Sequence, residues 1–488
     1  FFYMKNLYKL TASEIREKIL NKEVKVEELV KETFERIEKV EGKVGSFVHL
    51  RKEKALEEAR ILDEKIARGE KVGALAGVPV AIKDNMVSKG DITTACSKIL
   101  GNYEGIYDAT AVKKLKEADA IIIGITNMDE FAMGSTTKTS FHHLTKNPWD
   151  ATRVPGGSSG GAAASIAAQE VYISLGSDTG GSIRQPASFC GVVGMKPTYG
   201  RVSRYGLIAF ASSLDQIGPM AKSVEDIALT MNVIAGADDY DATVVNCEVP
   251  DYTQFLNQDI RGMKIGVPKE YFIDGINPEV RQIMEDAIEK FITLGAEIVE
   301  ISLPHTKYAV PTYYVIAPAE ASSNLARFDG VRYGYRSENI QNINDLYVNS
   351  RSEGFGDEVK RRIMIGTYVL SAGFYDAYFK KAQKVRAKIK EDFDRAFENV
   401  DVIFTPVSPS TAFRLDDKKT PIELYLEDIF TISANLAGIP GISIPAGKAQ
   451  GLPVGIQLLG KPFGEGDLIK AGSAFEKVRG EWELPELD

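Results

Sequence analysis

The first part of the chain repeats hydrophobic residues with the period of an α-helix. Residues 11 to 69 put apolar side chains on one stripe and Glu and Lys at the other positions, a pattern typical of amphipathic helices. The clearest stripes are formed by Val26, Leu29, Val30, Phe34 and Ile37 and by Leu56, Ala59, Leu62 and Ile66. Thr11 and Glu14 have the spacing of a capping box, which predicts that the first helix begins there.

Beyond residue 70 the pattern changes to short runs that are apolar at every position. Residues 77–82 and 120–125 are two such runs, and a helical pattern at 108–118 lies between them. Continuous apolar runs predict buried strands, and strands that alternate with helices predict an α/β fold. Further predicted strands are 171–175, 264–267, 297–301, 402–406, 442–445 and 453–458. Further predicted helices are 162–168, 223–235, 279–294, 358–370, 376–397 and 467–478.

These elements predict a chain organised in two parts. We expect residues 1–69 to form a helical segment packed on the core and residues 70–488 to form an α/β domain, and we allow for a side lobe around 250–400. Residues 201–220 mix turns and apolar pieces without a clear period, and residues 236–262 have the composition of a loop. The chain has 488 residues and 44% hydrophobic content, which suffices for a large core.

Composition then limits the classes of function. The net charge is −9 and no long basic run occurs, so we do not expect this chain to bind nucleic acid through its own charge. Cys96, Cys190 and Cys247 lie far apart without C-x-x-C spacing, which argues against disulfides or a cysteine zinc site and favours a reduced, cytoplasmic setting. Apolar runs stay below the roughly 18 residues of a membrane span, so we expect no membrane partner. The three residues before Met4 are too few for a signal peptide and are left out of the fold argument.

The candidate chemistry lies in one glycine- and serine-rich stretch, residues 153–185. It contains two turns of small residues, P-G-G-S-S-G-G and S-D-T-G-G-S, on either side of a predicted helix and strand. Glycines allow several backbone N–H groups to point at one place, and such a cluster of donors stabilises a developing oxyanion. One such turn alone is more often a flexible loop. Two turns joined by a helix of small residues favour a buried and rigid site.

Two better-known motifs match this stretch only in part. Gly156-x-Ser158-x-Gly160 has the pattern of a nucleophile elbow, but no strand leads directly into it and only His305 of the four histidines lies downstream. Residues 176–182 have the glycine spacing of a P-loop but lack its lysine. The four dispersed histidines also argue against a catalytic metal site.

A serine nucleophile that has no histidine usually relies on a lysine as its base. Lys83 follows the apolar run 77–82, where loss of water lowers the pKa of an amine and leaves a neutral form that can accept a proton. A lone lysine at the end of a strand is more often a solvated charge. The two serine turns, which need a base, favour the catalytic interpretation.

Three segments together resemble the signatures of the amidase signature family. They are A-I-K-D-N around Lys83, P-G-G-S-S-G-G around Ser158 and S-D-T-G-G-S-I-R-Q-P around Ser182. The resemblance implies a large, mixed, twisted sheet with helices on both faces. It also implies a triad in which Ser182 is the nucleophile, Ser158 a bridging serine in a cis peptide, and Lys83 the base. The implied oxyanion hole is formed by the backbone of Thr179, Gly180, Gly181 and Ser182.

Longer segments resemble one branch of that family, the glutaminase subunits of tRNA-dependent amidotransferases. They are T-N-M-D-E-F-A-M-G at 126–134, Y-G-R-V-S-R-Y-G-L-I-A-F-A-S-S-L-D-Q at 199–216, E-A-S-S-N-L-A-R-F-D-G-V-R-Y-G at 320–334 and E-V-K-R-R-I-M at 358–364. This likeness implies a cytoplasmic heterotrimer in which the present chain, without a cofactor of its own, releases ammonia from glutamine. One partner, the B subunit, would use ATP and Mg to amidate Glu-tRNA(Gln) or Asp-tRNA(Asn), and a small C subunit would brace the pair. A stand-alone amidase for another small or aryl amide remains the second interpretation.

The same likeness implies residues that would bind the two charged ends of glutamine. An arginine of E-V-K-R-R-I-M would hold the α-carboxylate, and Asp428 would hold the α-ammonium group. Tyr313 and Gly134 complete the expected substrate contacts.

Helix geometry helps to choose between the two candidate arginines. At about 100° per residue, Arg362 lies at the edge of a predicted buried face, while Arg361 points nearly the opposite way. That face is formed by Val359, Ile363, Gly366 and Leu370. We therefore choose Arg362, against the alternative that it only forms an internal ion pair.

Overall fold

One mixed β-sheet runs through the molecule. The computed structural model describes residues 6–487, so the three residues set aside before Met4 lie outside the described residues. Strands of the described chain form a single sheet with the order β1 (Phe47–Leu50), β3 (Ile121–Thr126), β2 (Pro79–Lys83), β4 (Ile173–Asp178), β6 (Gln216–Ala221), β5 (Val193–Lys196), β10 (Gly441–Ala449), β11 (Leu452–Gly460), β9 (Val402–Pro406), β7 (Lys264–Pro268) and β8 (Glu297–Ile301). The pairs β2–β3, β2–β4, β7–β8 and β7–β9 are parallel and the others are antiparallel. The predicted α/β fold with a large mixed sheet is confirmed.

Helices cover both faces of this sheet. The α-helices of the described residues are α1 (Ala12–Leu20), α2 (Val26–Val44), α3 (Lys52–Ala67), α4 (Thr110–Glu117), α5 (Gly160–Ala167), α6 (Arg184–Cys190), α7 (Val224–Ile234), α8 (Pro278–Thr293), α9 (Ala309–Asn324), α10 (Ile343–Gly354), α11 (Asp357–Leu370), α12 (Lys381–Ala396), α13 (Pro421–Leu426), α14 (Ile432–Ala437) and α15 (Glu465–Arg479). On one face of the sheet, Ile444 of β10 packs on Gly472 of α15. Its neighbour Ser443 points to the other face, where Gly455 of β11 lies against Ser188 of α6. Because successive strand residues point to opposite faces, α15 and α6 lie on opposite sides.

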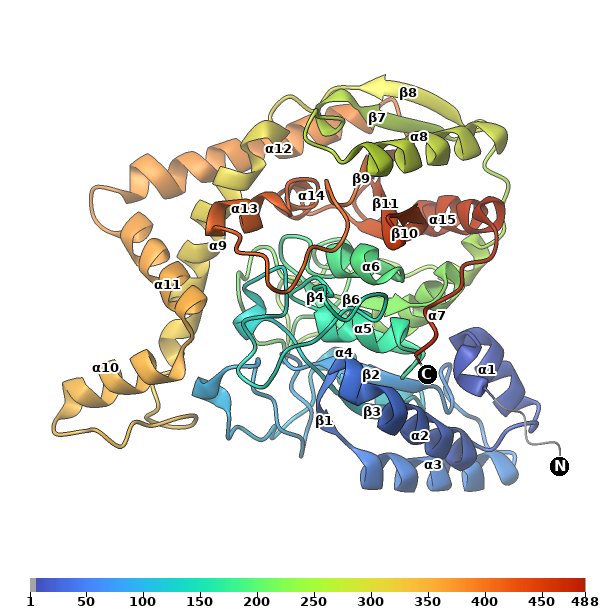
Figure 1. Cartoon of the computed structure of the whole chain (residues 1–488), viewed down its shortest axis with the longest axis horizontal. Helices are drawn as coiled ribbons and strands as arrows, with labels where there is room; N and C mark the ends of the chain where they lie inside the picture. The colour runs from blue at the N-terminus through green and yellow to red at the C-terminus, as the bar shows by residue number, and fades with distance from the viewer. Residues whose placement is uncertain (1–5, 488) are drawn as a thin grey trace.

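The N-terminal helices pack along one end of the molecule, at the bottom of Figure 1. The predicted capping box is confirmed: the Thr11 side chain accepts from the Glu14 N–H, and the Glu14 carboxylate accepts from the Thr11 N–H. The expectation that residues 11–69 are helical throughout is wrong at β1, which pairs antiparallel with β3. Four residues are too few to show a period of their own, and the open edge of β3 decides their conformation.

The region around residues 250–400 both extends the sheet and reaches beyond it. Strands β7 and β8 join the sheet next to β9, while α10, α11 and α12 form an arm on the left of Figure 1. Sequence patterning missed α9, because this helix is apolar on most sides and packs against α11, α12 and α14 at once. A π-helical turn at Tyr375–Lys380 precedes α12, so the helix predicted from residue 376 begins later than expected. The side lobe remains a prediction.

The centre of the sheet carries the serine-rich stretch. β2 and β4 are buried at every position, and β6 pairs with β4 from Ile173–Ala221 to Asp178–Gln216. β6 lies within the segment that showed no clear period, because Gly218 and Pro219 interrupt its apolar pattern. Among residues 6–487, no helix combines the length and the apolar character needed to cross a membrane.

Candidate active site

The strands β2 and β4 are parallel neighbours and end at the same edge of the sheet. Lys83 is the last residue of β2, and Ser177 and Asp178 are the last residues of β4. The two strands pair in parallel, so their carboxyl ends point the same way, which is where ligands bind in open α/β sheets. The helices that follow the two serine turns, α5 and α6, pack against each other above this edge.

Lys83 is fully buried among serine hydroxyls. Its Nζ donates to Ser158 Oγ at 2.7 Å, Ser159 Oγ at 2.8 Å and Ser177 Oγ at 2.8 Å. Burial lowers the pKa of Lys83 to about 7, and the more distant carboxylates of Asp129 and other residues offset this only in part. The lowered pKa confirms the sequence prediction and makes a neutral amine accessible near pH 7.

The turn around Ser158 admits only glycine at its narrowest points. A Cβ atom on Gly157 would lie 2.1 Å from an Asp129 carboxylate oxygen, and one on Gly160 would lie 2.0 Å from Thr137 Oγ1. The peptide bond between Gly157 and Ser158 is cis, as the family resemblance implies. The buried Asp129 carboxylate accepts hydrogen bonds from the N–H groups of Thr136 and Thr137, at 3.0 and 2.8 Å, and so fixes the wall of this turn.

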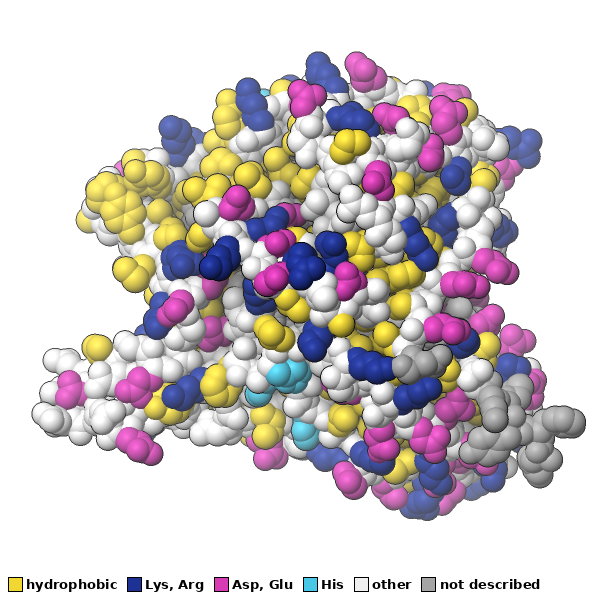
Figure 2. All heavy atoms as spheres, viewed as in Figure 1, with side chains coloured by type: hydrophobic (Ala, Val, Ile, Leu, Met, Phe, Trp, Pro, Cys, Tyr) yellow, Lys and Arg dark blue, Asp and Glu magenta, His cyan; other side chains and the backbone are white. Residues whose placement is uncertain are grey.

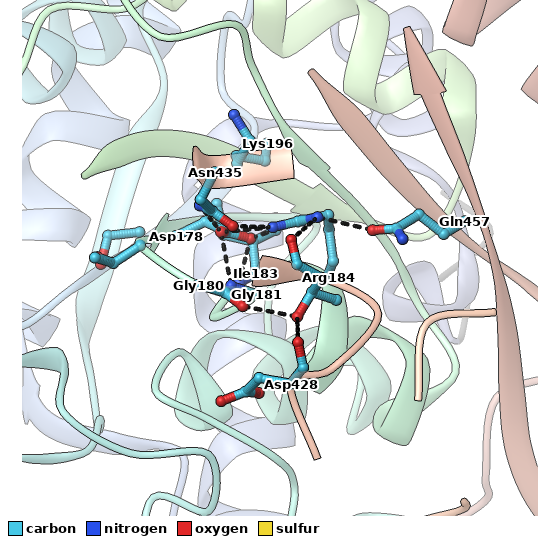
Figure 3. A network of polar contacts seen from close by, with 12 residues as sticks. Asp178, Gly180, Gly181, Ile183, Arg184, Lys196, Asp428, Asn435 and Gln457 are labelled. Carbon is cyan, nitrogen blue, oxygen red and sulfur yellow. Dashed lines mark hydrogen bonds and ion pairs between the residues drawn. The ribbon is translucent and has the colours of Figure 1, made fainter. Parts of the chain in front are cut away.

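The turn around Ser182 is held by a buried ion pair. The Asp178 carboxylate accepts from the N–H groups of Gly181 and Ile183 at 2.9 and 3.1 Å, and from Nε and Nη2 of Arg184 at 3.0 Å each. In Figure 3 the Arg184 guanidinium lies between Asp178 and Gln457, and Asn435 lies on the same carboxylate. Burial opposes ionisation of Asp178, but the Arg184 charge outweighs it and keeps the pKa far below its usual range. The carboxylate therefore stays charged and orders the turn.

The backbone donors of this turn divide into two groups. The Gly181 N–H is already bonded to Asp178. Within residues 6–487, the N–H groups of Thr179, Gly180 and Ser182 have no hydrogen-bond acceptor. Those three donors fit an oxyanion hole. At position 181 glycine is required because a side chain would clash: a Cβ there would lie 2.2 Å from Thr431 Oγ1.

The two serine turns contact each other directly. Ser159 donates its N–H to the carbonyl of Ser182 at 3.1 Å. Gln185 adds a second link, because its Oε1 accepts from the Gly157 N–H at 3.0 Å and its Nε2 donates to the Ser135 carbonyl at 3.2 Å. Within the described chain, the Ser182 hydroxyl itself has no hydrogen-bond partner. The positions of Ser158 and Ser182 are thus fixed relative to each other.

Arg362 is the buried arginine of α11, as helix geometry predicts. It is 3% exposed, while the side chain of Arg361 is 46% exposed. Its Nε donates to Glu358 Oε1 at 2.8 Å, and its guanidinium lies 5.4–5.7 Å from three aromatic ring centroids. Those rings belong to Phe210, Tyr314 and Tyr425. An ion pair with Glu358 therefore exists, but it uses only the Nε edge of the guanidinium.

The other expected substrate residues lie near the two turns. Asp428 is 8% exposed and accepts from Ser135 Oγ at 2.8 Å; burial raises the pKa of its carboxyl to about 8. Its carboxylate points away from the Asp178–Arg184 network in Figure 3. The Tyr313 ring lies against Gly180, where a Cβ would come within 2.8 Å of Cζ. Gly134 lies against Asp129, where a Cβ would be 2.5 Å from Cγ.

Several residues that build the site were not predicted. Five of them lie within the serine-rich stretch 153–185: Ser159, Ser177, Asp178, Arg184 and Gln185. Polar side chains in so buried a segment were the signal that could have revealed them. Thr431 is different. It donates to the Gly180 carbonyl at 2.7 Å and to the Asp428 carbonyl at 3.1 Å, yet it lies far away in the chain, and nothing in its surrounding sequence marks it.

The fold and the site define the class of this protein. Residues 28–469 match the model of the family described as amidase, and the chain belongs to this family. The A subunit of the glutamyl-tRNA(Gln) amidotransferase of Fusobacterium nucleatum is 72% identical over 483 residues, 99% of both chains. The A subunit of the same enzyme from Carboxydothermus hydrogenoformans is 62% identical over 472 residues, 96% of this chain and 97% of that one.

Solved structures of the family have the same fold. The A subunit of the Thermotoga maritima glutamyl-tRNA(Gln) amidotransferase superposes with a TM-score of 0.83 at 46% identity and covers 99% of both chains. A bacterial aryl acylamidase of the amidase signature family superposes with a TM-score of 0.85 at 26% identity and covers 96% of both chains. The fold is thus shared by enzymes with different amide substrates.

Proposed function

We propose that this chain is the glutamine-hydrolysing subunit of a tRNA-dependent amidotransferase that acts on Glu-tRNA(Gln) or Asp-tRNA(Asn). The observation that carries the proposal is the pairing of a serine–lysine centre with a site that has one buried arginine and one buried carboxyl group, Arg362 and Asp428. A free α-amino acid has the complementary charges, whereas an aryl amide has neither. Glutamyl-tRNA(Gln) amidotransferase A subunits that are 72% and 62% identical over nearly the whole chain support the same conclusion.

In the proposed reaction, Ser182 Oγ attacks the side-chain amide carbon of glutamine. Its proton passes through the Ser158 hydroxyl to neutral Lys83, and the tetrahedral oxyanion receives hydrogen bonds from the free N–H groups of the Ser182 turn. The proton then returns to the leaving nitrogen, ammonia departs, and an acyl-enzyme remains on Ser182. Water, activated through the same relay, releases glutamate. Each oxyanion donor contributes roughly 3–4 kcal/mol to stabilising the transition state.

The contacts of Lys83 suit this relay. A neutral amine donates two hydrogen bonds and accepts one, so one of its three hydroxyl neighbours must donate to it. Ser159 already donates its hydroxyl proton to the Ser177 carbonyl at 3.0 Å. The Ser158 hydroxyl has no other acceptor within residues 6–487, which leaves its proton free to point at Lys83.

The charged site would bind glutamine by both ends. Glu358 occupies the Nε edge of Arg362 and leaves the two Nη groups for a bidentate bond to the α-carboxylate. Asp428, whose pKa lies near 8 in the free site, becomes a stable carboxylate when the α-ammonium group approaches, because an opposite charge favours the ionised form. Tyr313 and Gly134 would border the substrate between these ends and Ser182.

We also propose a cytoplasmic complex with a B subunit, which uses ATP and Mg and binds the misacylated tRNA, and with a small C subunit. The present chain would use no cofactor in glutamine hydrolysis. Figure 2 shows hydrophobic side chains gathered on the left, over the connection between α11 and α12. Exposed aromatic residues there are Tyr368, Phe374, Tyr375 and Tyr378. An exposed apolar patch of this kind is typical of a protein–protein contact and supports the presence of a partner chain.

The proposal is tested by measuring amide hydrolysis with and without partners. We expect the full chain to release ammonia from glutamine slowly alone and much faster with the two partner subunits, ATP and misacylated tRNA. The assembled complex should also amidate the tRNA from free ammonia when Ser182 is replaced by Ala. Faster hydrolysis of an aryl amide than of glutamine, with no response to partners or tRNA, would instead identify a stand-alone amidase.

A further inference from the structure

Three different metal-ligand side chains converge on one point outside the serine–lysine centre. A carboxylate oxygen of Asp84, Sγ of Cys96 and a ring nitrogen of His142 lie within 4.8 Å of one another. The Cys96 Sγ is 3.3 Å from Asp84 Oδ2, and His142 Nε2 is 4.0 Å from the same oxygen. We propose that these three residues bind a divalent transition-metal ion such as Zn²⁺.

The spacing of the ligand atoms suits such an ion. Zinc binds sulfur at about 2.3 Å and nitrogen or oxygen at about 2.0–2.2 Å, so tetrahedral ligands lie roughly 3.3–3.7 Å apart. The distance from Cys96 Sγ to Asp84 Oδ2, 3.3 Å, lies in this range, and the distance from His142 Nε2 to the same oxygen, 4.0 Å, is slightly longer. Thr94 Oγ1, 2.9 Å from His142 Nε2 and hydrogen-bonded to Asp84, marks the place of the fourth ligand, a hydroxyl or a water molecule.

The charges around Asp84 provide an independent argument. Asp84 is completely buried, and among residues 6–487 no lysine or arginine forms an ion pair with it; its one basic neighbour is His142. The carboxylate accepts hydrogen bonds from the N–H groups of Thr94 and Cys96, at 2.9 Å each, but these donors are neutral. A bound metal ion would supply the missing positive charge.

Neighbouring groups hold the Cys96 sulfur in place beside Asp84. Its S–H lies 3.3 Å from Asp84 Oδ2 and 3.2 Å from Asn127 Oδ1. On binding, the S–H bond breaks, the proton leaves to solvent, and the sulfur forms a bond to the metal. His142 is exposed, so the ion can enter from its side.

This site is separate from the proposed reaction. Asp84 directly follows Lys83, the last residue of β2, but the two side chains have different partners. The Asp84 carboxylate bonds to Thr94 and Cys96, whereas the Lys83 amine bonds to serine hydroxyls. The three ligands have no recognisable spacing in the sequence, which is why four dispersed histidines pointed away from a metal. The proposed ion contacts neither Ser158 nor Ser182 and is not a catalytic metal.

The test is a titration of the purified, chelator-treated full chain with Co²⁺, a spectroscopic substitute for Zn²⁺. We expect one equivalent to bind with a thiolate-to-cobalt charge-transfer band in the near ultraviolet, and Zn²⁺ to displace it. Cys96→Ser should abolish the band. His142→Ala should weaken Co²⁺ binding at least about tenfold. Mutation of residues that only hydrogen-bond to metal ligands already lowers metal affinity by about that factor.

His143→Ala is the matched control, because His143 is the exposed neighbour of His142 and lies outside the ligand group. It should leave the band and the affinity unchanged. Cys247→Ser, at a half-buried cysteine outside the group, should also leave the band intact. The proposal is wrong if no charge-transfer band forms at millimolar Co²⁺. It is equally wrong if His142→Ala and His143→Ala have the same effect, since that identifies an adventitious ion only. Because His142 is exposed, its variant remains informative even if Cys96→Ser fails to fold.

Discussion

Two buried cationic side chains, Lys83 and Arg184, lie on neighbouring parts of the same site and differ in what surrounds them. Both are 0% exposed. Lys83 has three serine hydroxyls as its side-chain partners, and within residues 6–487 it forms no hydrogen bond to a carboxylate. Arg184 forms two hydrogen bonds to the Asp178 carboxylate and further bonds to Gln457, Asn435 and the Thr431 carbonyl.

This difference separates a reactive group from a structural one. Burial removes water from the amine of Lys83, the distant carboxylates compensate only in part, and its pKa falls to about 7. With Asp178 beside it, the charge of Arg184 is retained and fixes the backbone of the Ser182 turn. Arg362 is intermediate, since Glu358 pairs with one edge of its guanidinium and leaves the other for a ligand.

Lys83→Arg gives the largest expected effect. Arginine keeps the charge but cannot release its proton in a protein, so we expect glutaminase activity to fall by about 10²–10⁴-fold, as after loss of a general base. Lys83→Ala should be equally inactive. Glutaminase rates of the assembled complex provide the measurement, with ammonia-dependent tRNA amidation as the control. Substantial activity in Lys83→Arg would mean that the residue acts only as a positive charge.

Arg184→Met should reduce stability rather than remove a base. It leaves the Asp178 carboxylate buried and unpaired, which costs about 3–5 kcal/mol. Lys83→Met, its matched control, leaves neutral hydroxyls rather than a charge without a partner, so it should cost less, about 1–3 kcal/mol. Denaturant unfolding of both variants measures this. Equal destabilisation would remove the distinction between the two cations.

Arg362→Ala and Asp428→Asn should raise the KM for glutamine about 30-fold or more, the effect of removing one partner of a buried charged contact. Arg361→Ala, at the exposed neighbour that also pairs with Glu358, should leave KM nearly unchanged. Steady-state kinetics with glutamine test this, and amidation from ammonia should survive in all three variants. A KM that rises only in Arg361→Ala would show that the helix-face argument chose the wrong arginine.

The pH dependence of activity should follow Lys83. Its pKa of about 7 lies below the ordinary value, so kcat at saturating glutamine should increase about tenfold per pH unit below 7 and level off above it. Between about pH 7 and 10.5 the unfolded chain binds a proton at this lysine and the folded chain does not, so this group contributes stability that grows with pH. A flat kcat profile from pH 6 to 8 in a folded enzyme contradicts this assignment.

Glu358→Gln should have a small effect. A neutral amide still accepts a hydrogen bond from Arg362 Nε, and about 1 kcal/mol of orientation is lost, which raises the KM for glutamine roughly fivefold while kcat changes little. Tyr425→Phe, which removes a hydroxyl 2.9 Å from Glu358 Oε1, should give a still smaller shift. An equal fall in kcat and kcat/KM would instead place Glu358 in the reaction itself.

The sequence by itself determined the fold class, most strands of the sheet and the candidate triad, but it did not predict β1, β5 or β6. Strands that are buried on both faces, such as β2 and β4, must be apolar nearly throughout, and this pattern is readable without a structure. The glycines of the two serine turns are equally readable, because no other residue fits where a Cβ would lie about 2 Å from its neighbours. The choice of Arg362 over Arg361 needed only helix periodicity.

Tertiary structure alone decided which distant residues meet. Thr431 bonds to Gly180 of the Ser182 turn, 251 residues earlier in the chain, and Tyr425 bonds to Glu358, 67 residues earlier. Asp84, Cys96 and His142 come together from three segments without any shared spacing. A local pattern records only which face of an element is buried; which other element covers that face depends on the packing of the whole chain. That packing also removes water from Lys83 and so sets its pKa.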